Sequence, residues 1–373
     1  MSALTEGLIA QPTADEVKFT PRTEYDGQVG HIQTGPLEAA PKSHTDILEL
    51  FGYDPAEVRI IGHPRVSRWQ TYDERWLSAY RFQLAPVPAA EMPDIADAIR
   101  RHKPHTPSKP SGGAAFVFHA CDLQLGKVDG DSIEGTTDAF LSSVDIAVEE
   151  FTRLSTHRGT STVQLVFPGD ICEGNQSQGG ALMWRTVLTI TEQMRMMRRL
   201  FFHVVERFAP LADVVYLDVV NGNHDEAQRH PVQTRPDDGH ATEQAIAVGD
   251  MLGMNPAAFG HVTVRVPPVD QHWMTVPVGN TTVTVAHGHK WRRGKAMDWL
   301  ANQALHMTNV TGSQVLQHGH EHRWTVDTNA ARTVICAPAF DGGSTWLGNG
   351  SAGVRGGLTY VLDEGRVLDM RVV

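Results

Sequence analysis

Cysteine is scarce in this sequence: the chain of 373 residues has three, Cys121, Cys172 and Cys336. Their odd number and wide separation argue against a disulfide framework and fit a reducing compartment. No apolar run reaches the length that spans a membrane, and the first residues lack the pattern of a signal peptide. We therefore expect a cytoplasmic protein that makes no membrane contact.

Positive charge is also in deficit. The 43 Asp and Glu residues outnumber the 32 Lys and Arg residues, which gives a formal net charge of −11. The surface as a whole should repel nucleic acid. Any polyanionic substrate must therefore be held by local cations or by bound metal.

The length of the chain favours one large domain or two unequal ones. Residues 1–43 are rich in Pro, Gly, Thr and charged residues without a sustained period, which predicts an extended or disordered arm. Residues 44–101 predict a small α+β accessory module with two strands between short helices. Prolines and glycines in residues 102–113 indicate a linker, and the main domain follows in residues 114–373.

The accessory module mixes basic and aromatic residues, namely Arg65, Arg68, Trp69, Arg75, Trp76, Tyr80 and Arg81. Such a set could stack on a nucleic acid strand and neutralise it. Aromatic residues more often form the core of a small module, and the arginines would then be its solvated face. The sequence leaves open whether this module binds nucleic acid or a protein partner.

Strands and helices alternate from Ala114 onward. The apolar patterns predict strands at 115–118, 163–167, 214–220, 262–266, 281–286 and 314–317, and helices at 136–154, 181–208 and 295–307. This order predicts a layered α/β domain.

Polar residues follow five of these strands directly. The groups are Asp122-Leu123-Gln124, Gly169-Asp170, Asn223-His224-Asp225, His287-Gly288-His289 and His318-Gly319-His320-Glu321-His322. One histidine cluster alone would fit a polar surface turn. In open α/β sheets, however, ligands bind at the carboxyl ends of strands, and carboxylates, amides and imidazoles are metal ligands. Five such groups in succession predict a metal site.

The order of these groups resembles the motifs of the calcineurin-like metallophosphoesterases. That family has Asp-x-His, Gly-Asp-x-x-Asp/Glu, Gly-Asn-His-Asp/Glu, a later His and Gly-His-x-His. Here the series reads Asp122-Leu123-Gln124, Gly169-Asp170-Ile171-Cys172-Glu173, Gly222-Asn223-His224-Asp225, His287 and Gly319-His320-Glu321-His322. The resemblance covers residues 114–340 and implies a layered metallophosphoesterase fold of β-sheets flanked by helices. The segment Asp-Leu-Gln-Leu-Gly-Lys at 122–127 is similar to a divergent branch found in bacteriophages of actinobacteria, which resembles the Mre11/SbcD nucleases.

The resemblance implies two divalent metal ions bridged by Asp170. Their further ligands would be Asp122, Gln124 and His322 for one ion, and Asn223, His287 and His320 for the other. Gln124 stands where the family usually has histidine. Because its amide oxygen is a hard ligand, it favours Mn²⁺ or Mg²⁺ over Zn²⁺.

The resemblance also implies that His224 faces the substrate and stabilises the transition state or protonates the leaving oxygen, with Asp225 orienting it. Beyond His287, the residues His289, Lys290, Arg292 and Arg293 could hold phosphates that flank the scissile one. They could equally be the solvated start of a helix.

These observations predict a dinuclear metal-dependent phosphodiesterase that hydrolyses phosphate esters with metal-activated water. We expect an Mre11-like DNA exo- or endonuclease, encoded by a phage and acting in the host cytoplasm. Mn²⁺ is the favoured ion, with Mg²⁺, Fe²⁺ and Zn²⁺ as alternatives. The alternative functions are a small-molecule or nucleotide phosphoesterase and a non-catalytic nucleic-acid-binding scaffold with a weakened metal site. The expected partners are DNA or another phosphodiester, with a homodimer or a partner of the N-terminal module as alternatives.

Overall fold

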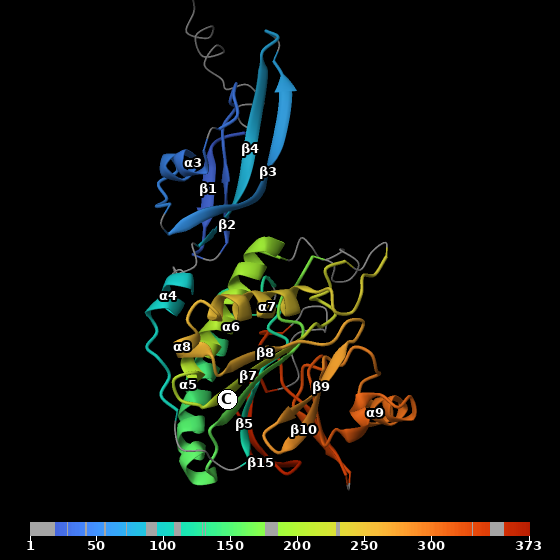
Figure 1. Ribbon diagram of the computed structural model, residues 1–373. Coiled ribbons are helices and arrows are strands. Elements are labelled where there is room, and N and C mark those ends of the chain that lie inside the picture. Colours follow the sequence, from blue (N-terminus) through green and yellow to red (C-terminus); the bar gives the residue numbers. More distant parts are fainter. Residues whose placement is uncertain are drawn as a thin grey trace, which may run out of the picture. The chain divides into compact units, whose positions relative to one another are not determined.

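The computed structural model describes residues 19–27, 29–41, 43–55, 57–71, 73–86, 95–107, 113–128, 130, 132–175, 186–228, 232–329, 331–343 and 354–373. The chain divides into two compact units, Met1–Glu91 and Met92–Val373 (Figure 1). Among the helices in these ranges, none combines the length and the apolar character that a membrane crossing requires.

In its described residues, the first unit has a four-stranded antiparallel sheet and one helix. Its strands are, in spatial order, β1 (Arg22–Tyr25), β2 (Gly30–Gln33), β4 (Trp76–Pro86) and β3 (Val58–Gln70). The helix α3 (His44–Leu50) begins at Ser43, whose hydroxyl accepts the Asp46 N–H. The buried core consists of Ile32, Ile47, Leu48, Val58, Phe82 and Leu84.

Strands β1 and β2 lie in the segment for which the sequence predicts an extended or disordered arm. They form a hairpin, and β2 pairs with β4 so that Gln33 lies opposite Arg81. Of the eight residues in the two strands, Ile32 alone is fully buried, so the alternation of polar and apolar residues is too weak to show in the sequence. Pairing with β4 therefore stabilises strands that the local sequence alone does not specify.

Helix α4 (Ile95–Arg101) belongs to the second unit, although the sequence predicts it within the accessory module. Ile99 is fully buried in the core of that unit. The side-chain amide of Asn255 donates to the carbonyl oxygens of Ile99 and His102, at 2.9 and 3.1 Å. These contacts tie α4 and the start of the predicted linker to the main domain.

The second unit contains two sheets. The six-stranded sheet has the order β15 (Arg366–Val372), β14 (Leu358–Asp363), β5 (Ala115–His119), β6 (Thr162–Pro168), β7 (Val214–Val220) and β8 (Val262–Arg265). The five-stranded sheet has the order β12 (Thr325–Thr328), β13 (Thr333–Cys336), β11 (Val315–His318), β10 (Thr281–Ala286) and β9 (Trp273–Val278). Strands β5 to β8 run parallel, as do β10, β11 and β13.

Helices cover the outer face of each sheet (Figure 1). The six-stranded sheet carries α5 (Ser132–Arg158), α6 (Ile190–Phe208), α7 (His240–Leu252) and α8 (Pro256–Phe259), and the five-stranded sheet carries α9 (Ala296–Leu305) and the 3-10 helix η3 (Asn309–Gly312). Successive side chains of a strand point to opposite faces. Phe116 and Phe118 therefore pack against the helices, while Ala115 and Val117 pack between the sheets. The layered α/β fold expected from the sequence is confirmed.

A buried polar network links the two sheets. The side chain of Gln164 in β6 donates to Asp218 at 2.6 Å and to the amide oxygen of Gln317 in β11 at 3.1 Å. Gln317 donates to the hydroxyl of Tyr360 at 2.7 Å, and Arg265 pairs with Asp218 at 2.6 Å. Buried polar groups are stable only with partners, so these contacts fix how one sheet lies on the other. This packing of one sheet on the other brings the carboxyl ends of both sets of parallel strands together.

Candidate metal centre

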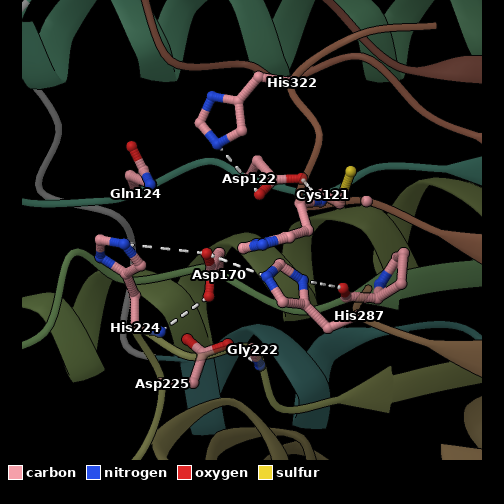
Figure 2. Close-up of polar contacts among 12 residues, drawn as sticks. Cys121, Asp122, Gln124, Asp170, Gly222, His224, Asp225, His287 and His322 are labelled. Carbon is pink, nitrogen blue, oxygen red and sulfur yellow. Dashed lines mark hydrogen bonds and ion pairs between the residues drawn. The ribbon is translucent and has the colours of Figure 1, made fainter. Parts of the chain in front are cut away.

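Loops from both sheets meet at the carboxyl ends of the strands (Figure 2). From the six-stranded sheet, β5 leads to Asp122, β6 leads to Asp170, and β7 leads to Asn223. From the five-stranded sheet, β10 leads to His287, and β11 leads to His320. The five groups of polar residues singled out in the sequence thus reach one region of the structure.

Five of the predicted ligands have left-handed backbones. The φ angles are 53° at Asp122, 46° at Gln124, 53° at Asp170, 69° at His320 and 49° at His322. Non-glycine residues rarely adopt this conformation, and those that do cluster at functional sites, where the surrounding structure holds them. The turns therefore place these side chains at a cost in local conformational energy.

Glycines allow the ligand loops to approach one another closely. A Cβ atom on Gly222 would lie 2.0 Å from Asp170 Oδ1, and one on Gly319 would lie 2.4 Å from Asp122 Oδ2. Both distances are far below van der Waals contact. These two positions accept only glycine without displacing a carboxylate of the centre.

Asp170, His287 and His320 form a compact triad. Each offers one ligand atom, and these atoms lie within 4.8 Å of one another. The Nδ1 of His287 donates to the carbonyl oxygen of Pro168 at 2.7 Å, so its Nε2, 3.0 Å from Asp170 Oδ2, is the atom that faces the centre. A backbone carbonyl that fixes the outer ring nitrogen of a histidine is the usual support for a metal ligand. In the described part of the chain, this is the one such cluster of His, Cys, Asp or Glu.

Buried oxygens around the triad fit a cation. Asn223 Oδ1 is buried and accepts no hydrogen bond from the described residues. Asp122 Oδ1 is also buried and lies 3.3 Å from His322 Nε2 without a well-directed hydrogen bond. An unsatisfied buried acceptor is costly. A divalent ion bound by oxygen and nitrogen ligands would satisfy these atoms.

Burial and charge act against each other on the ionisable groups. Burial alone would raise the pKa of the Asp170 carboxyl, but nearby imidazoles, His287 first, hold it well below its usual value. Burial lowers the pKa of His320 to about 4, so its ring is neutral and able to bind metal. Burial also acts to lower the pKa of His287 and His322, but Asp170 and Asp122 respectively outweigh it and raise the two values to about 9 and about 10.

His224 lies beside Asp170 and is held by Glu173. Its backbone N–H donates to Asp170 Oδ1 at 2.8 Å, and its Nδ1 lies 3.0 Å from the Glu173 carbonyl oxygen and 3.4 Å from Glu173 Oε2. Burial would lower the pKa of His224, but the charge of Asp170 and the contacts with Glu173 raise it to about 10. The sequence analysis did not assign Glu173 to the site. Its position three residues after Asp170, in the Gly-Asp-x-x-Glu motif, could have identified it.

The Asp225 carboxylate contacts backbone groups of the ligand loops, and in the described residues no hydrogen bond joins it to the His224 ring. Its Oδ1 accepts the backbone N–H groups of Ile171 and Cys172, both at 3.1 Å, and its Oδ2 accepts that of Gly222 at 2.8 Å (Figure 2). The carboxylate thus joins the loop after β6 to the loop after β7. Asp225 positions the ligand loops rather than the His224 ring.

Gln124 turns its oxygen away from the centre. The Nζ of Lys127 lies 2.8 Å from Gln124 Oε1, and an ammonium can only donate, so the amide oxygen faces the lysine. Figure 2 shows this oxygen pointing away from Asp122 and Asp170. Lys127 also pairs with Asp341 at 2.5 Å. Sequence reasoning missed both residues: Lys127 ends the Asp-Leu-Gln-Leu-Gly-Lys segment, and Asp341 carries no motif signal.

The predicted substrate-binding residues lie on the loop after β10. His289 is largely buried, and neither ring nitrogen has a hydrogen-bond partner among the described residues; its ring centroid lies 5.4 Å from that of His287. Lys290 and Arg292 are exposed, and Arg293 lies 3.7 Å from Glu321. His289 therefore adjoins the triad, while the arginines belong to the outer loop.

No family model and no curated protein match the sequence. An archaeal phosphodiesterase of solved structure is 13% identical, with 69% of this chain and 99% of that chain covered and a TM-score of 0.33. Wild-type Vps29 from Entamoeba histolytica, solved with Zn²⁺, is 14% identical, with 69% and 98% covered and a TM-score of 0.31. A predicted phosphoesterase from Streptococcus pneumoniae is 13% identical, with 46% and 76% covered and a TM-score of 0.24.

Proposed function

We propose that this chain is a metal-dependent phosphodiesterase that cleaves DNA. The observation that carries the proposal is the triad of Asp170, His287 and His320, with the buried Asn223 oxygen beside it. Two imidazoles, a carboxylate and an amide oxygen suit Mn²⁺, Fe²⁺ or Zn²⁺, and a set with two oxygen ligands favours Mn²⁺ among them.

A divalent ion at these four residues would polarise a phosphate oxygen and lower the pKa of a water molecule. The protein supplies the orientation. Asp170 is held by the His224 N–H, and His287 by the Pro168 carbonyl, so neither ligand has to reorganise when an ion binds.

His224 is placed to move a proton. Glu173 fixes its Nδ1, which leaves Nε2, 3.9 Å from Asp170 Oδ2, as the atom on the side of the centre. A protonated imidazole there can donate to the oxygen that leaves phosphorus. With no contact to the ring from Asp225, Glu173 is the residue that sets its orientation.

DNA is the substrate that the nearby cations favour. Lys290 and Arg292 are exposed on the loop that carries His287, and burial lowers the pKa of His289 between them and the triad, so that ring is a neutral hydrogen-bonding group. Cations along a backbone neutralise phosphates on both sides of the scissile bond. A chain with a net charge of −11 needs such a local set to hold a polyanion.

The test is hydrolysis of bis-p-nitrophenyl phosphate and of linear DNA with added Mn²⁺. Asp170→Asn and His224→Ala should lose activity on both substrates, because the first removes a charged ligand and the second the proton donor. The matched controls, Asp138→Asn and His157→Ala, change exposed side chains of α5 and should retain it. Retained activity in Asp170→Asn would contradict the proposed centre.

Two results would point to the alternative functions. Hydrolysis of the small ester without cleavage of DNA would indicate a nucleotide or other small-molecule substrate. Bound metal without hydrolysis of either substrate would indicate a nucleic-acid-binding scaffold, an alternative that the orientation of the Gln124 oxygen toward Lys127 supports.

A further inference from the structure

The sheet of the first unit has two unlike faces. Helix α3 packs on one face, in a buried core with Ile32, Phe82 and Leu84 of the strands. Because successive side chains of a strand point to opposite faces, the odd-numbered residues of β4 lie on the other face, together with the residues opposite them in β2 and β3. We call this second face the arginine face, after Arg22, Arg65 and Arg81.

The three arginines lie in one row across the sheet. Arg22 of β1 lies opposite Gln33 of β2, and Gln33 lies opposite Arg81 of β4. Arg81 in turn lies opposite Arg65 of β3. Neighbouring strands are about 4.8 Å apart, so the row spans about 14 Å. Like charges that lie directly opposite destabilise a sheet. The pair of Arg65 and Arg81 therefore costs stability until an anion binds to it.

All three arginines are exposed, and none has an acidic partner among the described residues. Arg75, just before β4, differs from them, because it pairs with Asp73 at 2.7 Å and with Glu38 at 3.1 Å. In the described strands of this unit, the arginine face carries one acidic residue, Glu24, which lies 3.9 Å from His31 Nδ1. The row is thus a local excess of positive charge on a chain whose net charge is −11.

The aromatic residues singled out in the sequence of this unit have partners within the protein. Tyr80 packs against the buried core, and the Trp69 ring stacks on that of Phe19 with 4.6 Å between centroids. Trp76 lies on the α3 face, where the guanidinium of Arg68 is 4.8 Å from its ring centroid. Proteins that bind single strands use free aromatic rings to stack on bases. The arginine row without such a ring fits a phosphate backbone instead.

We propose that the arginine face binds the phosphate backbone of double-stranded DNA. Guanidinium groups pair with phosphate oxygens through two parallel hydrogen bonds. A duplex carries one negative charge per about 1.7 Å of its axis, so a row of about 14 Å meets more phosphates than it has arginines. DNA held by the first unit is present at a high effective concentration for the metal centre of the same chain. The choice of DNA among polyanions rests on the proposed function.

The test measures binding of a fluorescently labelled duplex to the full-length protein by anisotropy, over a series of salt concentrations. A chelator is present throughout, so bound metal makes no contribution. Each of Arg22→Gln, Arg65→Gln and Arg81→Gln should reduce the slope of log affinity against log salt by about 0.9, and the triple variant by about 2.7. The triple variant should also bind at least about tenfold more weakly. Arg75→Gln makes the same chemical change at an arginine with carboxylate partners and should keep the wild-type slope.

Thermal unfolding shows whether a loss of binding comes from a loss of structure. Arg65→Gln removes one of two opposed charges, so its melting temperature should equal or exceed that of wild type. A folded triple variant with wild-type affinity and slope would overturn the inference. Tighter binding of single-stranded than of duplex DNA would reject the duplex as the partner. If wild type binds the duplex through these arginines but hydrolyses neither ester, the proposed function fails while the arginine face stands.

Discussion

The substitution Asp225→Asn tests whether Asp225 positions the ligand loops or takes part in the chemical step. In the structure the carboxylate accepts three backbone N–H groups, from Ile171, Cys172 and Gly222, and it is fully buried. Asparagine keeps the shape of the side chain but has one oxygen in place of two. Its amide nitrogen is a donor and cannot accept from Gly222.

The size of the effect follows from these contacts. A buried N–H of Gly222 that loses its acceptor costs about 1–3 kcal/mol. The two hydrogen bonds to the remaining oxygen lose their charge assistance, which costs about 1 kcal/mol more. We therefore expect Asp225→Asn to lower the free energy of unfolding by about 3 kcal/mol. Because Asp170 and Asn223 lie on the loosened loops, affinity for Mn²⁺ should fall by about 10–100-fold.

Urea unfolding in the presence of a chelator measures the first effect without a contribution from bound metal. Titration with Mn²⁺ measures the second. Asp138→Asn makes the same chemical change on an exposed face of α5 and should shift the free energy of unfolding by less than about 0.5 kcal/mol. If Asp225→Asn keeps wild-type stability and metal affinity but loses turnover, Asp225 acts in the chemical step and the reasoning is refuted.

Three further variants test the site and its support. Gly222→Ala places a methyl group 2.0 Å from the original position of Asp170 Oδ1, so Mn²⁺ affinity in a titration should fall at least about tenfold; unchanged affinity would mean that the two loops are not rigid. Gln317→Leu removes the donor to the Tyr360 hydroxyl between the sheets and should lower the free energy of unfolding in urea by about 1–3 kcal/mol. Arg292→Ala should weaken DNA binding and reduce the slope of log affinity against log salt by about 1, and an unchanged slope would remove Arg292 from the DNA contact.

The place of the candidate centre followed from sequence because its ligands come directly after strands. Parallel neighbours such as β5, β6 and β7 end at the same edge, so the residues after them, Asp122 and Asp170 among them, must come close. The alternation of strands and helices in residues 114–317 was strong enough to identify this arrangement. The close packing of His287 and His320 against Asp170 needed the second sheet, whose position depends on buried contacts.

Three features could not be predicted, each because the partner lies far along the chain or carries no local pattern. Asp341 meets Lys127 across 214 residues, and no motif links the two. The role of Asp225 depends on which N–H groups its carboxylate accepts, which residue type alone does not specify. The hairpin of residues 22–33 depends on pairing with β4, and its own residues lack an apolar face.

The neighbours of β5 determine when the centre can form during synthesis. β5 is the first strand of its sheet to leave the ribosome, yet it lies between β6 and β14, with Phe118 opposite Thr359. One edge of β5 therefore stays unpaired until residues 358–363 have been made, and unpaired edges invite association with other chains. Asp122 follows β5 directly, and its carbonyl oxygen accepts the backbone N–H of Phe340. A nascent chain released before that point would lack the framework that holds Asp122, so metal binding reports that synthesis has reached the last strands.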